Sequence, residues 1–140
     1  MNIAFAASEG VPFSKTGGLA DVVGALPRAL AALGHQVSVY LPRYRQTKLT
    51  DSTVVVRSVT VPFDDQYRFA SVVSGGTQGG VRFYFVEYAP FFDRDALYGT
   101  PAGDFPDNAH EDGAARGVVD GAVMDLRQDR QPAPGSGERR

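Results

Sequence analysis

An α/β fold, with a parallel sheet and an inserted β-hairpin, is predicted by three features of this 140-residue sequence. The first 42 residues follow a strand–helix–strand pattern. Residues 53–88 are rich in β-branched and aromatic residues, which are typical of strands. The length suits one domain with a single apolar core. We therefore expect one βαβ unit with a hairpin beside it.

The strand–helix–strand unit starts with a continuous apolar run, "NIAFAAS" (2–8), as expected for a strand covered on both faces. Pro42 closes the second strand, "HQVSVYLP", and a right-handed crossover makes the two strands parallel. Gly34 stands where a helix-capping glycine is expected. Pro27 predicts a kink or a division into two short helices. The helix itself is predicted by the spacing of Leu19, Val22, Val23, Leu26, Leu30 and Leu33.

Three further strands are expected in "TVVVRSVTV", "QYRFASVV" and "GVRFYFVEY". The loop "SGGTQG" separates the last two and suits a hairpin. Because "VRFYFVEY" is apolar on both faces, we expect it to be central in the sheet.

The last third of the sequence has a different composition. All 15 aromatic residues lie at or before Phe105, so the segment that follows is expected to build little core. Its end, "RQDRQPAPGSGERR", has the composition of a disordered tail. Apolar residues between Ala115 and Leu126 keep helical spacing, but Gly117 and Gly121 weaken that helix.

Composition excludes several classes of function. A net charge of -2 provides no basic face for nucleic acid or for an anionic membrane. With no cysteine and only two histidines, a zinc site lacks ligands. No window approaches the roughly 20 apolar residues needed to cross a bilayer, and "MNIAFAASEG" reads as a strand without a basic leader. A cytoplasmic protein is expected.

The segment "PFSKTGGLADVV" (12–23) is the candidate functional loop. Only Lys15 and Lys48 are lysines among the 14 basic residues, and Lys15 stands one residue before the pair Gly17 and Gly18, where the predicted helix starts. A loop that joins a strand to a helix N-terminus is a place where open α/β sheets bind anions. The glycines allow positive φ and close approach of a ligand, and Lys15 can add a compact positive charge to a phosphate.

Two common phosphate motifs do not fit this loop. Ser14 occupies the place before the lysine where the Walker A pattern requires glycine, and Pro12 removes a backbone donor. The dinucleotide fingerprint is missing, and Arg43 and Arg45 stand where an acid is expected. A P-loop and NAD binding are therefore not predicted, and no cofactor is expected.

Each residue of the loop also has a structural interpretation. Gly17 and Gly18 could serve only a turn, and Lys15 could be a solvated side chain. Asp21 could be a first-turn acid that the helix dipole favours. Glu9 could face a hydroxyl-bearing substrate or be a solvated loop carboxylate.

The sequence resembles the N-terminus of bacterial glycogen synthases and plant starch synthases. The run K-T-G-G-L-A-D-V at 15–22, preceded by "ASE" and followed by "LP-AL-LGH-V-V-LP", is the most specific part of this resemblance. "YG" at 98–99 and "FPDNA" at 105–109 add to it. The resemblance covers about residues 1–109, and residues 110–140 resemble nothing in the family, so we expect a divergent, disordered or frameshifted tail.

The resemblance implies an incomplete N-terminal domain of a GT-B glycosyltransferase, which has two Rossmann-like domains. It implies transfer of glucose from ADP-glucose to the non-reducing end of an α-1,4-glucan with retention. Lys15, Gly17 and Gly18 would surround the donor's phosphates, and Asp21 and Glu9 would contribute to substrate binding. The 140 residues alone are expected to be inactive. The alternative is a non-catalytic fragment that binds anions or glucan, or the inactive product of a disrupted gene; oligomeric state is left open.

Overall fold

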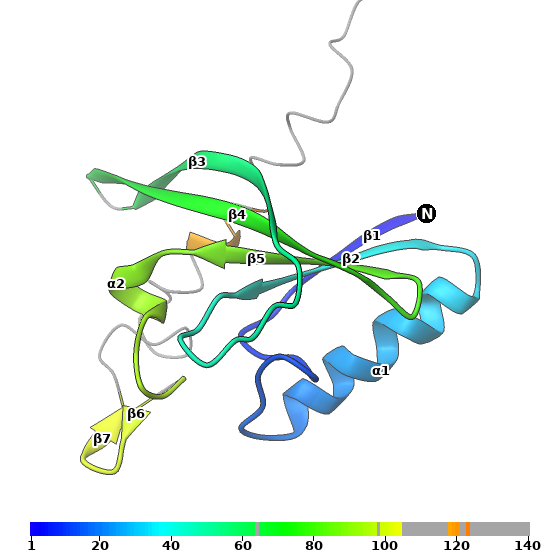
Figure 1. Ribbon diagram of the computed structural model, residues 1–140, viewed down its shortest axis with the longest axis horizontal. Coiled ribbons are helices and arrows are strands. Elements are labelled where there is room, and N and C mark those ends of the chain that lie inside the picture. Colours follow the sequence, from blue (N-terminus) through cyan, green and yellow to red (C-terminus); the bar gives the residue numbers. More distant parts are fainter. Residues whose placement is uncertain (64, 98, 105–117, 121–122, 124–140) are drawn as a thin grey trace, which may run out of the picture.

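A five-stranded mixed sheet is the main element of the fold, with helices on both faces (Figure 1). The structure is a computed structural model and describes residues 1–63, 65–97, 99–104, 118–120 and 123. The elements in chain order are β1 (Asn2–Ala6), α1 (Gly18–Ala32), β2 (Gln36–Pro42), β3 (Thr53–Phe63), β4 (Gln66–Gln78), β5 (Val81–Glu87), α2 (Ala89–Phe92), β6 (Gly99–Thr100) and β7 (Gly103–Asp104).

The sheet combines a parallel and an antiparallel half. Its strand order is β1-β2-β5-β4-β3, in which β1, β2 and β5 are parallel and β4 and β3 run antiparallel to their neighbours. The predicted βαβ unit and the hairpin beside it are therefore confirmed. Strand β5 is third of five, as its apolar sequence predicts, and its residues are buried except at Arg82 and Glu87, which are partly buried.

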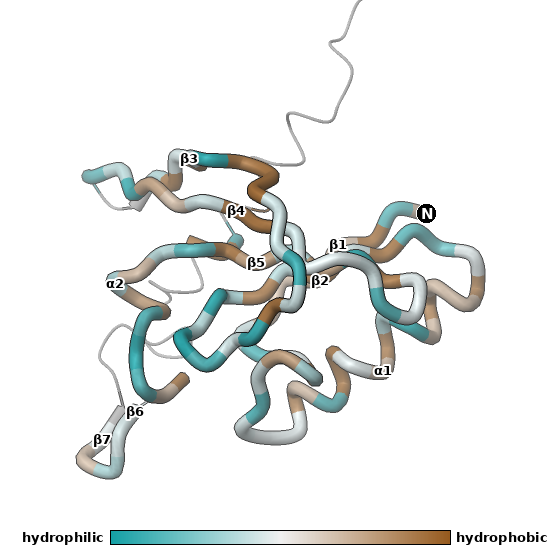
Figure 2. Tube along the Cα trace, viewed as in Figure 1, coloured by the Kyte–Doolittle hydropathy of each residue, from teal (hydrophilic) through white to brown (hydrophobic). Residues whose placement is uncertain are grey.

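Apolar side chains cover both faces of the sheet. Figure 2 marks hydrophobic residues in brown along the chain trace. Helix α1 lies over one face, where the buried residues are Val23, Val37, Val39, Leu41, Val73, Val81, Phe83 and Phe85. The opposite face packs against α2 and against a helical segment at 118–120 and 123. This two-sided burial explains the continuous apolar runs of β2 and β5.

The segment without aromatic residues contributes more core than its composition predicts. Val118, Val119 and Val123 are all buried and belong to the cluster on the second face of the sheet. The expected helix is confirmed at the positions that are described, 118–120 and 123. The prediction of little core was wrong here because three valines on one side of a helix fill space without any aromatic ring.

The hairpin between β4 and β5 turns later than predicted. Strand β4 continues through "SGGTQ" to Gln78, and the turn lies at Gly79 and Gly80, with φ of 57° and 77°. Two-residue hairpin turns of this kind require positive φ at both central positions, which glycine adopts freely. Gly76, with φ of 85°, lies instead where the pairing register shifts between Ser74 and Thr77.

Helix α1 is one continuous helix, so the predicted division at Pro27 is wrong. Pro27 is buried on the side of α1 that faces the sheet, together with Ala20, Val23 and Gly24, and this packing offsets the hydrogen bond that proline cannot donate. Gly34 has φ of 89° just beyond the helix, as a capping glycine should.

Three sequence predictions fall outside the described residues. These are the family-like "FPDNA" at 105–109, the domain boundary after residue 109 and the disordered tail; the tyrosine of the "YG" pair, at 98, is also outside. Within the part of the chain that is described, no helix has both the length and the apolarity to span a bilayer.

Close packing of α1 on the preceding loop generates a first prediction. A Cβ added at Gly24 would lie 2.3 Å from Val11 Cγ2, whereas one at Gly18 would meet nothing within 4 Å. Gly24→Ala should therefore lower the free energy of unfolding by about 1 to 3 kcal/mol through overpacking. Urea denaturation measures this, with Gly18→Ala as the matched helical control; equal stability of the two variants would contradict the packing described.

Candidate functional site

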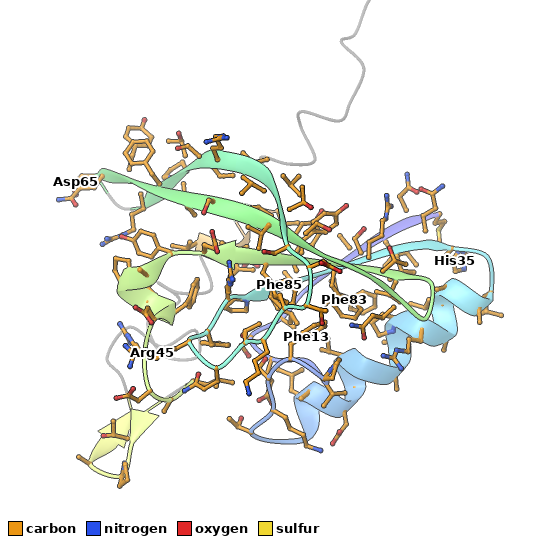
Figure 3. All side chains as sticks on the ribbon, viewed as in Figure 1. Phe13, His35, Arg45, Asp65, Phe83 and Phe85 are labelled. Atoms are coloured by element: carbon orange, nitrogen blue, oxygen red, sulfur yellow. The ribbon has the colours of Figure 1, made fainter. Side chains whose placement is uncertain are left out.

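The candidate site is the loop of residues 7–17, which joins the carboxyl end of β1 to the N-terminus of α1. Gly10 and Ser14 close a tight turn through two backbone hydrogen bonds of 3.1 and 3.0 Å. Phe13 anchors the turn in the core, with its ring centroid 5.0 Å from Phe83 and 4.8 Å from Phe85 (Figure 3). The loop is therefore held by the sheet rather than free in solvent.

Glu9 fixes the second half of the loop from inside. Its side chain is buried, with only 2% of the residue exposed, and one carboxylate oxygen accepts hydrogen bonds from Thr16 N (2.6 Å) and Thr16 Oγ1 (2.7 Å). A carboxylate is buried at acceptable cost only when such donors replace water. The interpretation of Glu9 as a solvated carboxylate is therefore wrong.

Lys15 lies next to Thr16 and carries its ammonium to the first turn of α1. Lys15 Nζ is 2.8 Å from each carboxylate oxygen of Asp21, and the two side chains are 52% and 58% exposed. An ammonium has three N–H donors, so this pairing leaves one for another acceptor. The position of the charge at the helix N-terminus agrees with the sequence prediction.

Gly17 and Gly18 do not use the positive φ that glycine allows. Gly17 has φ of -154° and ψ of -159°, which is extended backbone, and Gly18 begins the helix. The close approach of a ligand that these glycines allow is possible. A Cβ at Gly18 would project into open space, and one at Gly17 would come only as near as 4.0 Å to Glu9 Oε1. An external group can approach the backbone there.

The N-terminus of α1 has no side-chain cap from Gly17. The first N–H groups of a helix have no partner within the helix, and together with the helix dipole they favour an anion. The loop thus combines helix N–H groups, a lysine ammonium and unobstructed backbone. This is the chemistry of a phosphate-binding loop.

Other polar groups of the same rim are occupied within the protein, and sequence reasoning gave them no role. Arg43 pairs with Glu87, which also accepts from Ser71 Oγ at 2.8 Å. Arg45 pairs with Asp93 at 2.8 Å and also with Asp95, and the hydrogen bond that it donates to Asp93 raises the pKa of its guanidinium. These partners lie 44 to 50 residues apart, so no local spacing reveals them.

A metal site is not evident in the described residues, which contain no group of three histidine or acidic side chains placed to hold an ion.

Tyr44, from the loop after β2, donates to the carbonyl of Ser8 at 2.8 Å and so ties the candidate loop to its neighbour.

Comparison with known proteins identifies the family. The family model described as the starch synthase catalytic domain matches residues 2–125. The chain belongs to this family. Glycogen synthase of Koribacter versatilis is 68% identical over 125 residues, which make up 89% of this chain and 26% of that protein. Glycogen synthase of Syntrophotalea carbinolica is 45% identical over 115 residues, 81% of this chain and 24% of that protein.

A solved structure agrees with the fold of this starch synthase family chain. The catalytic domain of starch synthase IV from Arabidopsis thaliana, bound to ADP and acarbose, superposes with a TM-score of 0.61 at 29% identity, covering 72% of this chain and 21% of that one. The fold is therefore part of a starch synthase catalytic domain. The chain spans about a quarter of the length of the curated relatives it matches.

The family match also extends past residue 109, where the sequence resemblance ends, to residue 125. The added stretch includes the helical positions 118–120 and 123, whose valines are buried in the core. The division of the chain at residue 109 and the frameshift after it stay predictions.

The difference in burial between the Glu9 carboxylate of the loop and the Asp21 carboxylate of α1 generates a second prediction. Glu9→Gln replaces a buried, charge-assisted acceptor and should cost about 1 to 3 kcal/mol of unfolding free energy. Lys15→Met breaks only an exposed ion pair and should cost less than about 1 kcal/mol. Urea denaturation of both variants tests this. A larger loss for Lys15→Met than for Glu9→Gln would show that Glu9 does not hold the loop.

Proposed function

We propose that this chain is the N-terminal part of a glycogen synthase and that its β1–α1 loop binds the phosphates of ADP-glucose. In the complete enzyme the reaction would transfer glucose, with retention, to the non-reducing end of an α-1,4-glucan. The observation that carries the proposal is the Lys15 ammonium at the uncapped N-terminus of α1, 2.8 Å from Asp21. The ADP bound to the similar starch synthase supports a nucleotide as the ligand.

Lys15 would act on the leaving group. Glucose transfer releases a nucleoside diphosphate, whose negative charge grows as the bond to the sugar breaks. Positive charge and N–H groups that are already in place stabilise that charge without having to reorganise. The free N–H of Lys15 and the first amides of α1 would supply part of this stabilisation.

Asp21 would hold the lysine ready and take part in donor binding. Because its charge offsets that of Lys15, the pair adds little net field, and a diphosphate would gain mainly from direct contact. Gly17 and Gly18 would let the phosphates reach the backbone, since among the described residues a Cβ at Gly18 would meet nothing within 4 Å and one at Gly17 only Glu9 Oε1, at 4.0 Å.

Glu9 would act through Thr16 rather than by touching substrate. Its carboxylate is buried and holds the amide and hydroxyl of Thr16, so it sets the path of the backbone between Lys15 and Gly17. We therefore assign it a positioning role in donor binding. We propose that the reaction uses no cofactor or metal and that the protein is cytoplasmic.

The alternative is a non-catalytic chain that binds anions or glucan, or an inactive product. The observation that favours it is coverage: the matched region amounts to about a quarter of each relative. The two ideas differ in whether ADP-glucose binds and whether Lys15 matters for that binding.

Donor binding is tested by calorimetric titration of the chain with ADP-glucose. Lys15→Ala should weaken binding about ten- to hundredfold, since a hydrogen bond to a charged group contributes roughly 1.5 to 3 kcal/mol. Lys48→Ala, at the only other lysine, is the matched control and should leave the affinity unchanged. Equal affinities of the wild type and Lys15→Ala would contradict the phosphate role, and binding of maltooligosaccharide alone would favour the alternative.

Transferase activity is a separate test. We expect the isolated 140-residue chain to transfer no measurable glucose from ADP-glucose to a maltooligosaccharide, because most of the catalytic domain seen in its relatives has no counterpart here. Radiolabelled ADP-glucose with maltoheptaose as acceptor gives the necessary sensitivity. Labelled product above the level of a heat-denatured sample would contradict this expectation.

A further inference from the structure

Tyr44 reaches the candidate loop from a neighbouring part of the sheet edge. It lies two residues after the end of β2, it is buried, and its hydroxyl donates to the carbonyl of Ser8 at 2.8 Å. Strands β1 and β2 are parallel neighbours, so the segments that follow them leave the same edge of the sheet. The contact therefore joins two loops across 36 residues of sequence.

The Ser8 carbonyl lies where the candidate loop leaves the sheet, since the chain still bonds to β2 at residue 7. Because each peptide unit is planar, a hydrogen bond to this carbonyl also fixes the orientation of the Glu9 amide. The Glu9 carboxylate in turn holds Thr16 at 2.6 and 2.7 Å, and Thr16 is the neighbour of Lys15. A hydrogen bond at Ser8 therefore acts on the position of Lys15 through Glu9 and Thr16.

Tyr44 is itself held by groups outside the candidate loop. Its ring packs edge-on against Phe92 of α2, with the ring centroids 5.8 Å apart. Its amide donates to Thr47 Oγ1 at 3.1 Å, and Thr47 N donates back to the Tyr44 carbonyl at 3.0 Å. The amides on either side of Tyr44 donate to carbonyls of β5 and α2. The position of the Tyr44 hydroxyl is therefore set by β5 and α2 and not by the loop that it contacts.

Tyr88 offers a matched comparison at the same edge of the sheet. Its hydroxyl accepts a hydrogen bond from Arg68 Nη1, also at 2.8 Å, but that bond links the start of α2 to β4. Each of the two tyrosine rings also packs against a phenylalanine ring. Substitution by phenylalanine removes the hydroxyl's bond and keeps the ring in both cases. The two substitutions therefore separate an effect on the candidate loop from a general effect on stability.

We propose that Tyr44 is a positioning residue of the donor site, whose hydroxyl sets the path of the β1–α1 loop and with it the place of the Lys15 ammonium. Tyr44 does not touch the diphosphate. A binding site must be held within about 0.5 Å of its productive geometry by supporting hydrogen bonds, and Tyr44 supplies one from a separate loop. The effect on ADP-glucose rests on the proposed function, whereas the effect on the loop is a property of the free chain.

Amide hydrogen exchange of the ligand-free chain is the first measurement. The amides of Gly10 and Thr16 form hydrogen bonds inside the loop. In Tyr44→Phe they should exchange about three- to tenfold faster, because loss of one supporting hydrogen bond makes local opening easier by about that factor. Tyr88→Phe should leave both rates unchanged. Amides of β2 and β5 should stay as protected as in the wild type in both variants.

Calorimetric titration with ADP-glucose is the second measurement. Tyr44→Phe should weaken the affinity about three- to tenfold, and Tyr88→Phe should not, although each variant loses one hydrogen bond and both should show similar losses in thermal unfolding. The double variant Lys15→Ala/Tyr44→Phe should lose less affinity than the product of the two single losses, because Tyr44 acts through the loop that presents Lys15.

Unchanged exchange at Thr16 in Tyr44→Phe would overturn the proposal, whatever the affinity. Equal losses of affinity in Tyr44→Phe and Tyr88→Phe would also overturn it, because they would indicate a general effect of stability, and so would an affinity that Tyr44→Phe leaves unchanged. If the wild-type chain does not bind ADP-glucose, it is the proposed function that fails. The exchange rate at Thr16 then decides by itself whether Tyr44 positions the loop.

Discussion

The hydrogen bonds between the buried Glu9 carboxylate and Thr16 are the constraint on which the candidate site depends. They fix both the amide and the hydroxyl of Thr16 at 2.6 and 2.7 Å, and Thr16 lies between Lys15 and Gly17. A charge buried to this degree would be destabilising without such donors. The burial of the carboxylate therefore depends on the path of the loop, and the path of the loop depends on the carboxylate. Phe13 in the core and Tyr44 on the Ser8 carbonyl support the same loop from either end. The ammonium of Lys15 and the open backbone at Gly18 are the consequence of this arrangement.

The fold could largely be predicted from local patterns, and the exceptions have physical causes. Continuous apolar runs reveal strands that are buried on both faces, and helical spacing with Gly34 reveals α1. The position of the hairpin turn was predicted wrongly because two glycine pairs are available in this segment. Only the pairing register of the strands decides that Gly79 and Gly80 form the turn, while Gly76 lies where the register of β4 and β5 shifts. The buried valines at 118, 119 and 123 were underestimated because aromatic content is a poor guide to the packing of small side chains.

The site was predictable in position but not in geometry. A lysine before two glycines at a strand–helix junction indicates an anion-binding loop wherever the chain folds as α/β. That Lys15 pairs with Asp21, six residues later, depends on the loop path, which no periodicity encodes. Burial of Glu9 follows from the same path, and the pairs of Arg43 and Arg45 need partners from β5 and the loop after α2. Of the two properties of glycine that the sequence suggests, positive φ is not used, whereas the lack of a side chain leaves the backbone open.

The proposed phosphate loop and the coverage of the relatives fit the same picture of a partial catalytic domain. The described supports of the loop come from the βαβ unit and from β5, where Phe83 and Phe85 contact Phe13. Catalysis needs more, since the acceptor and the rest of the donor have no described binding residues here. Family membership supports the proposal that the loop binds the phosphates of a sugar nucleotide.

Amide hydrogen exchange at Thr16 tests the central claim most directly. If its N–H is bonded to a buried carboxylate, exchange should be at least about tenfold slower than at the neighbouring Lys15, and Glu9→Ala should remove that difference while the β2 and β5 amides stay protected. A Thr16 amide that exchanges as fast as Lys15 in the wild-type chain would contradict the account.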